Sequence, residues 1–205
     1  MKAVVQRVAQ ASVTVAGEQI SSIGKGLCVL LGISTEDTEK DVEYMVRKIL
    51  NLRLFDDESG RAWSKSVMDR GLEVLCVSQF TLQSVLKGNK PDYHMAMPSE
   101  SAQPLYSGML EAMRKAYKAD YVKDGQFGAY MQIHIQNDGP VTIQLESPAS
   151  PTDSKQLAKL EKQQQRKEKT QPHATSKPGR EKPDSSVDTS KTSGTEGGDS
   201  SQREP

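Results

Sequence analysis

Cysteine and histidine are scarce in this sequence of 205 residues, which contains two cysteines and three histidines. Two cysteines cannot form a structural zinc site without other ligands, and His94, His134 and His173 lie far apart in the sequence. Cys28 and Cys76 each lie inside an apolar run, as expected for buried, unreactive thiols in a reducing compartment. We therefore expect no metal and no other cofactor, and no further feature supports a disulfide.

Long apolar runs and glycine-rich phosphate loops are also missing. No segment has the length and hydropathy of a signal peptide or a membrane span. This predicts a soluble protein of the cell interior, which we expect in the cytoplasm and in part in the nucleus, with no membrane partner. There is neither a Walker loop nor a Gly-x-Gly-x-x-Gly after a strand, so nothing supports nucleotide hydrolysis.

Aromatic residues are few, and all ten lie at or before Tyr130. The segment 148–205 has none of them, is rich in Pro, Ser, Thr, Gly and Lys, and contains 11 basic and 9 acidic residues. Such a composition disfavours a packed core, so we predict a folded domain over 1–147 and a low-complexity, partly basic, disordered tail over 148–205. Within the tail, residues 155–169 are either a solvated stretch or a basic arm for nucleic acid or a protein partner.

Hydrophobic periodicity predicts about seven strands and two main helices in the domain. Strands are expected at 1–15, 19–23, 27–33, 52–55, 72–78, 127–135 and 141–145, with a loop at 83–98 and a tight turn at 137–142. One helix is expected to start at Asp37 as its N-cap and the other at about Ser99. Two helices cannot cover both faces of so much sheet. We therefore predict an α/β fold, a three-layer β/β/α sandwich with the helices on one of two sheet layers.

The segment 74–82 begins as a buried strand rich in β-branched residues and then becomes polar. Its polar residues are Ser78, Gln79 and Thr81, with Phe80 between them. The bland interpretation is that they cap the strand and turn the chain. The functional interpretation is that a rigid strand end presents polar chemistry.

A nucleophilic Thr81 or Ser78 would need an adjacent base. No histidine has the spacing of a catalytic triad to either residue, and only His94 or Lys87, folding back from the following loop, could supply one. Main-chain amides and hydroxyls alone suit binding and stabilisation of an oxyanion. This chemistry fits the hydrolysis of an already activated ester.

Several motifs resemble those of the D-aminoacyl-tRNA deacylase family. They are Ser78-Gln-Phe-Thr-Leu82, Asn137-Asp-Gly-Pro-Val-Thr142, Gln6-Arg-Val8 and Ala11-Ser-Val-Thr-Val15. The resemblance spans about residues 1–146, with the motifs in the family's order. The tail resembles the extension of vertebrate members, a branch that is also linked to DNA-unwinding-element binding and replication initiation.

The resemblance implies an enzyme that hydrolyses the ester between a D-amino acid, or mischarged glycine, and the terminal adenosine of tRNA. It implies a homodimer with each active site at the subunit interface. Ser78, Gln79, Phe80 and Thr81 would form the catalytic pocket of one subunit. Gly139 and Pro140, joined by a cis bond, would come from the partner and select substrate chirality through main-chain carbonyls, and Arg7 and Asn137 would support their loop.

Two points stay open on the sequence alone. By composition most Gly-Pro pairs are ordinary trans turns, and Thr81 could act either as a nucleophile or as a positioning group. A second function is also kept: a DNA-binding, replication-associated factor that uses the basic tail, with DNA or replication proteins as partners. Removal of the residues after Ser147 would separate this function from deacylation.

Overall fold

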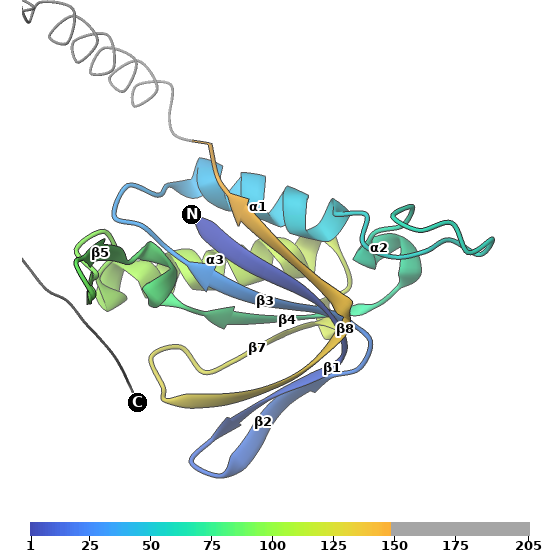
Figure 1. Ribbon diagram of the computed structural model, residues 1–205, viewed down its shortest axis with the longest axis horizontal. Coiled ribbons are helices and arrows are strands. Elements are labelled where there is room, and N and C mark those ends of the chain that lie inside the picture. Colours follow the sequence, from blue (N-terminus) through green and yellow to red (C-terminus); the bar gives the residue numbers. More distant parts are fainter. Residues whose placement is uncertain (149–205) are drawn as a thin grey trace, which may run out of the picture. The chain divides into compact units, whose positions relative to one another are not determined.

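The computed structural model describes residues 1–148, which form a six-stranded sheet, a two-stranded hairpin and three α-helices (Figure 1). The strands of the sheet are β1 (Lys2–Val15), β2 (Glu18–Ile23), β3 (Gly26–Gly32), β4 (Glu73–Ser78), β7 (Val122–Asp124) and β8 (Met131–Glu146), and the hairpin is β5 (Val85–Lys87) with β6 (Lys90–Asp92). The helices are α1 (Glu39–Asn51), α2 (Val67–Arg70) and α3 (Ser99–Ala116), with 3₁₀ turns η1 (Phe80–Gln83) and η2 (Ala119–Tyr121). The predicted tail lies outside the described residues, apart from Pro148.

The long strand β1 organises the sheet, because it pairs along both of its edges. Its first half, up to Val8, is antiparallel to β3, and its second half, from Ala11, is antiparallel to β2. β8 runs along the opposite edge of both halves. The order is therefore β2-β1-β3-β4-β7, with β8 added beside β1. In Figure 1 the second half of β1 curves away from β3 and β4 together with β2 and the first part of β8.

The strands β3 and β4 are covered on both faces, which explains why they are apolar at nearly every position. On one face, Leu27, Val29, Leu31, Val74 and Cys76 belong to the core shared with α1 and α3. On the other face, Cys28, Leu75 and Val77 pack with Val8, Val13 and Ile23 from β1 and β2. These two cores, one on each side of β3 and β4, confirm the predicted β/β/α sandwich.

Both main helices are confirmed, and each buries one apolar stripe. The buried residues are Val42, Met45, Val46, Ile49 and Leu50 in α1, and Ala102, Tyr106, Met109, Leu110 and Met113 in α3. The predicted N-cap of α1 was wrong by one residue. Thr38 is the N-cap, and the carboxylate of Asp41 accepts hydrogen bonds from both its main chain and its hydroxyl at 2.9 Å. No helix within residues 1–148 is both long and apolar enough to cross a membrane.

Three local predictions were wrong. The predicted loop 83–98 contains the hairpin β5–β6, whose strands are too short and exposed to show a hydrophobic period. The segment 52–55 is not a strand but ends in an isolated bridge between Phe55 and Lys65. The predicted turn at 137–142 lies within the continuous strand β8.

The two cysteine thiols should be unreactive in the folded protein, because both are buried. Cys28 and Cys76 are free and fully buried, on opposite faces of the β3–β4 layer. Burial raises the pKa of each thiol to about 12, and the thiolate is the reactive form. We expect an aromatic disulfide reagent at pH 8 to modify neither cysteine in the folded protein and both in guanidinium. A fast reaction of either thiol before unfolding would contradict this packing.

Candidate active site

The end of β4 positions the first group of predicted site residues. Ser78 closes the strand in register with Leu31 of β3, and the amide of Gln79 donates to the Leu31 carbonyl over 2.6 Å. The chain then tightens into η1. Gly32 of β3 lies directly against this turn, because a Cβ there would be 2.8 Å from Cβ of Leu82 and 2.9 Å from the carbonyl oxygen of Gln79. This close approach fixes the position of the turn on the sheet.

The four side chains of residues 78–81 lie together at this strand end. Ser78, Gln79 and Thr81 are half-buried, whereas Phe80 is 57% exposed. The side-chain amide of Gln79 donates a hydrogen bond to the hydroxyl of Thr81. Phe80 packs edge to face on Tyr93, with 5.2 Å between the ring centroids. Hydroxyl and amide groups therefore lie beside an accessible aromatic surface.

Within the described residues, neither candidate base forms a hydrogen bond with Thr81. The hydroxyl of Thr81 is paired with the amide of Gln79, which cannot take up a proton. His94 and Lys87 instead engage Asp92 in the hairpin: Nδ1 of His94 lies 2.8 Å from a carboxylate oxygen, and Lys87 forms an ion pair with the same group. Hydrogen bonding from Lys87, and then from His94, holds the pKa of Asp92 well below its usual value. Both candidate bases, His94 and Lys87, are therefore already paired with the carboxylate of Asp92.

The second group of predicted residues lies in a bulge of β8, residues 138–140, which we call the Gly139 loop. Two consecutive residues of β1 pair with Val141 and Asn137, so the three residues between these leave the ladder. Gly139 has a φ of +115°, its bond to Pro140 is cis, and both residues are exposed. A bulge of this kind turns main chain outward from the sheet.

Arg7 holds the Gly139 loop. Its Nε lies 3.3 Å from both the carbonyl oxygen and a carboxylate oxygen of Asp138, and its Nη1 donates to the carbonyl of Leu54 over 2.7 Å. A Cβ on Gly139 would lie only 2.8 Å from Nη2. The guanidinium therefore lies directly against the loop and connects it to the segment after α1.

Asn137 lies at the base of the same loop. Its Nδ2 donates to the hydroxyl of Thr142 over 3.2 Å, which joins the two ends of the loop. Its Oδ1 is buried and has no hydrogen-bond partner within the described residues. Trp63, for which the sequence predicted neither an element nor a role, contacts Arg7, with 5.9 Å between the central carbon of the guanidinium and the ring centre.

One chain does not bring the two groups together. Ser78 is level with Leu31 and hence with Ala3 of β1, whereas Val141 is level with Arg7. Along the strand direction, the four residues from Ala3 to Arg7 correspond to roughly 13 Å. Across the sheet, the three strand spacings from β8 to β4 correspond to roughly 14 Å more. In Figure 1 the end of β4 and the bend of β8 lie at opposite ends of the layer.

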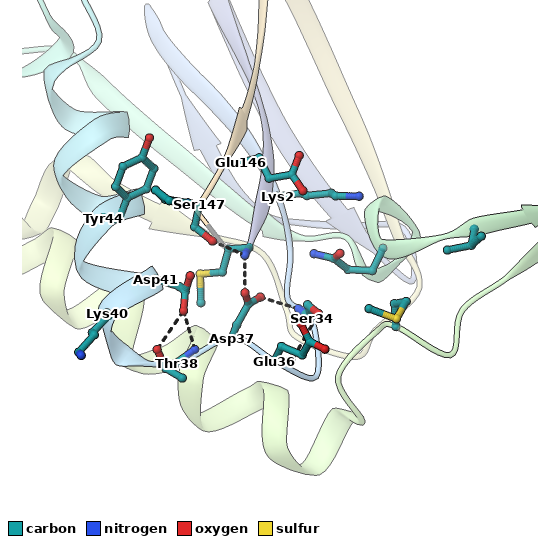
Figure 2. A pocket seen from close by; sticks show the side chains of 15 residues that line it. Lys2, Ser34, Glu36, Asp37, Thr38, Lys40, Asp41, Tyr44, Glu146 and Ser147 are labelled. Carbon is teal, nitrogen blue, oxygen red and sulfur yellow. Dashed lines mark hydrogen bonds and ion pairs between the residues drawn. The ribbon is translucent and has the colours of Figure 1, made fainter. Parts of the chain in front are cut away.

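A cavity of about 850 Å³ is lined by the start of β1, residues 34–44 and the end of β8, together with Gln83 of η1, Val85 and Met95 (Figure 2). The amino group of Met1 donates to Asp37 and, over 2.6 Å, to the hydroxyl of Ser147. Burial raises the pKa of the Asp37 carboxyl. None of residues 78–81 lines the cavity, and residues 1–148 contain no group of three or more side chains that could hold a metal ion.

Known proteins match this chain over its described part or over its whole length. The family model described as D-Tyr-tRNA(Tyr) deacylase matches residues 4–146. A zebrafish (Danio rerio) protein named D-aminoacyl-tRNA deacylase 1 is 70% identical over the full length of both chains. A Chlorobaculum parvum protein named D-aminoacyl-tRNA deacylase is 53% identical over 149 residues, which cover 72% of this chain and 99% of that protein.

A solved structure named c-Myc DNA Unwinding Element Binding Protein is also similar. It has a TM-score of 0.71 and 72% identity, and the match covers 73% of this chain and all of that one. The family match spans more than half of the sequence and contains both predicted site motifs. This chain therefore belongs to the D-Tyr-tRNA(Tyr) deacylase family.

Proposed function

We propose that this protein hydrolyses the ester of D-aminoacyl-tRNA in a pocket built from two copies of the chain. One subunit supplies residues 78–81, and its partner supplies Gly139 and Pro140. The observation that carries the proposal is the distance between these two groups within one chain of a deacylase-family protein. In an isologous dimer, each copy would lend its loop to the other's pocket, which gives two equivalent sites.

The surface around residues 78–81 supports a second copy at this place. Phe80, Val85, Leu86 and Tyr93 are exposed apolar side chains in η1, the hairpin and the residue after it, with Leu86 70% exposed. Exposed apolar side chains gathered in one region, of which Phe80 and Tyr93 are in contact, are typical of a protein interface. We propose that the partner covers part of this region and so excludes water from the ester.

Substrate selection follows from the kind of groups in the Gly139 loop. Glycine has no side chain and proline carries only an apolar ring, so the polar groups of these two residues are main-chain ones. We propose that their carbonyls capture the substrate's α-amino group and leave no room for a side chain in the L-configuration. Glycine is achiral, so the same site should accept glycyl-tRNA.

For the chemical step we propose hydrolysis by water. Thr81 has no base beside it, and a neutral hydroxyl without a base is a poor nucleophile. The ester's neighbouring ribose hydroxyl would assist the water, and the main-chain amides of Phe80 and Thr81 would hold the developing oxyanion, since the amide of Gln79 already donates to Leu31. Arg7 and Asn137 would act on the loop alone, and no cofactor takes part.

A Thr81→Ala variant tests the role of the hydroxyl. We expect turnover to stay within about tenfold of the wild-type value, because one hydrogen bond is worth about 1 kcal/mol. Single-turnover deacylation with quenched samples would measure the rate and detect any acyl-enzyme. Complete loss of turnover with normal tRNA binding, together with a trapped acyl-enzyme in the wild type, would replace this mechanism with nucleophilic catalysis.

The main test of the function compares matched D-aminoacyl-tRNA, L-aminoacyl-tRNA and glycyl-tRNA as substrates of the wild-type protein. We expect rapid release of the D-amino acid and of glycine, and little release of the L-amino acid. The same set with a different side chain should give a similar ratio between enantiomers, since main chain does the selecting. Equal hydrolysis of both enantiomers would refute the proposal.

DNA association through the basic tail is the second candidate function. The observation in favour of DNA association is the similarity to the solved structure named c-Myc DNA Unwinding Element Binding Protein, whose match covers 73% of this chain. The tail itself lies outside the described residues. A chain ending at Ser147 should retain deacylation, as expected from the length of the Chlorobaculum parvum relative, and should lose any affinity for duplex DNA. Loss of deacylation on truncation would contradict the predicted domain boundary.

A further inference from the structure

We propose that Trp63 is a positioning residue that keeps the Gly139 loop in its substrate-selecting conformation by restraining Arg7. This inference rests on the proposed function, in which that loop distinguishes the enantiomers. Trp63 is the only tryptophan of the chain. Its contact with the loop is indirect, through the guanidinium of Arg7.

The backbone of Trp63 is in a conformation that bulky residues rarely adopt. Its φ is +59°, in the left-handed region where glycine and asparagine are usual. Such outliers persist where the surroundings determine them strongly, and they cluster at functional positions. Here a different residue type would hold the same turn with less strain, so the indole is the feature that needs an explanation.

The loop that presents Trp63 is held on both sides. Phe55 and Lys65 form an antiparallel bridge in which the amide of Phe55 donates to the carbonyl of Lys65 over 3.0 Å and the reverse bond is 2.9 Å. Before Trp63, the carboxylate of Asp57 accepts from the amide of Arg61 over 3.0 Å. Hydrogen bonds therefore fix the loop that contains Trp63, although Trp63 itself is 56% exposed.

The Trp63 ring gives the Arg7 guanidinium a third contact, in addition to its hydrogen bonds from Nε and Nη1. Two of its edges are occupied by Asp138 and by the carbonyl of Leu54. Its central carbon lies 5.9 Å from the centre of the Trp63 ring, within the range of a cation–π interaction. A planar guanidinium that is hydrogen-bonded at two of its nitrogens and also lies over an aromatic ring has less freedom to tilt.

Loss of the indole should therefore loosen the loop without breaking the site. Water would reach the face of Arg7, and the guanidinium could tilt away from Asp138 and Gly139. A cation–π contact of ordinary strength corresponds to about a two- to fivefold effect. We expect this effect in the ratio of D- to L-aminoacyl-tRNA hydrolysis, a readout that general destabilisation of the fold would not move.

Two variants separate the ring from the strained backbone. Trp63→Asn removes the ring but tolerates a positive φ, whereas Trp63→Phe keeps an aromatic face with similar strain. We expect Trp63→Asn to lower the D-to-L ratio about two- to fivefold at unchanged thermal stability, and Trp63→Phe to restore most of it. A Trp63→Asn variant with the wild-type ratio would overturn the inference and leave the proposed function intact, provided that Gly139→Ala loses activity in the same assay.

The single tryptophan also allows a test that does not depend on catalysis. We expect Arg7→Met to change the emission maximum and raise the acrylamide quenching of Trp63, because the guanidinium no longer covers one face of the ring. The folded wild type and an Arg47→Met variant serve as references, since Arg47 lies over Tyr44 instead. Unchanged emission and quenching in Arg7→Met would show that the contact is absent in solution and would overturn the inference.

Discussion

Replacement of Gly139 by alanine is expected to reduce deacylation of D-aminoacyl-tRNA by about a hundredfold, the size of effect that a displacement of about 1 Å can have at a reacting centre. The reason is steric. The residue has a φ of +115°, and the added Cβ would meet Nη2 of Arg7 at 2.8 Å and Cγ2 of Val141 at 3.0 Å. Both neighbours are held, Arg7 by Asp138 and Leu54 and Val141 by its pairing with β1, so the loop must move.

Gly17→Ala is the matched control for this variant. Gly17 also has a positive φ, +85°, but nothing lies within 4 Å of its added Cβ, and it lies in the turn after β1. Both variants should lose roughly 1–2 kcal/mol of folding stability from the left-handed backbone, and Gly17→Ala should keep its activity. Steady-state deacylation and denaturant unfolding of both proteins measure the two effects. Full activity in Gly139→Ala would remove the Gly139 loop from the site.

Two inactive variants are expected to restore activity when they are combined in one dimer. Gly139→Ala damages the loop, and the double variant Gln79→Ala, Phe80→Ala removes an amide and an aromatic ring from the pocket. In a mixed dimer, the intact pocket of the first variant would receive the intact loop of the second. Of the two equivalent sites of a symmetric dimer, one would be whole, so we expect about half of the wild-type activity.

The mixed dimer can be isolated by co-expression of the two variants with different C-terminal tags and sequential purification on both. Each variant alone, purified in the same way, should remain inactive. An inactive mixed dimer of correct mass would show that each site is built within one chain. This result would contradict the proposal, which rests on the distance between residues 78–81 and the Gly139 loop within one chain. A monomeric wild-type protein with full activity would exclude the shared site altogether.

Much of the fold could be predicted because its signals are local. The continuous apolar runs of β3 and β4 predict strands covered on both faces, and the stripes of α1 and α3 predict helices with one buried face. Together these patterns require three layers. The hairpin β5–β6 shows the limit of such reasoning, because its short, exposed strands have no hydrophobic period.

Residue order alone was enough to define the two motifs of the candidate site, the lack of a base at triad spacing from Thr81, and the β/β/α layers. The bulge of residues 138–140 from a continuous strand could not be predicted in this way, because it depends on the register between β8 and β1. The same holds for the position of Arg7 between the Gly139 loop and Trp63. These contacts join residues that are remote along the chain, and no local pattern of side chains contains the strand register that brings them together.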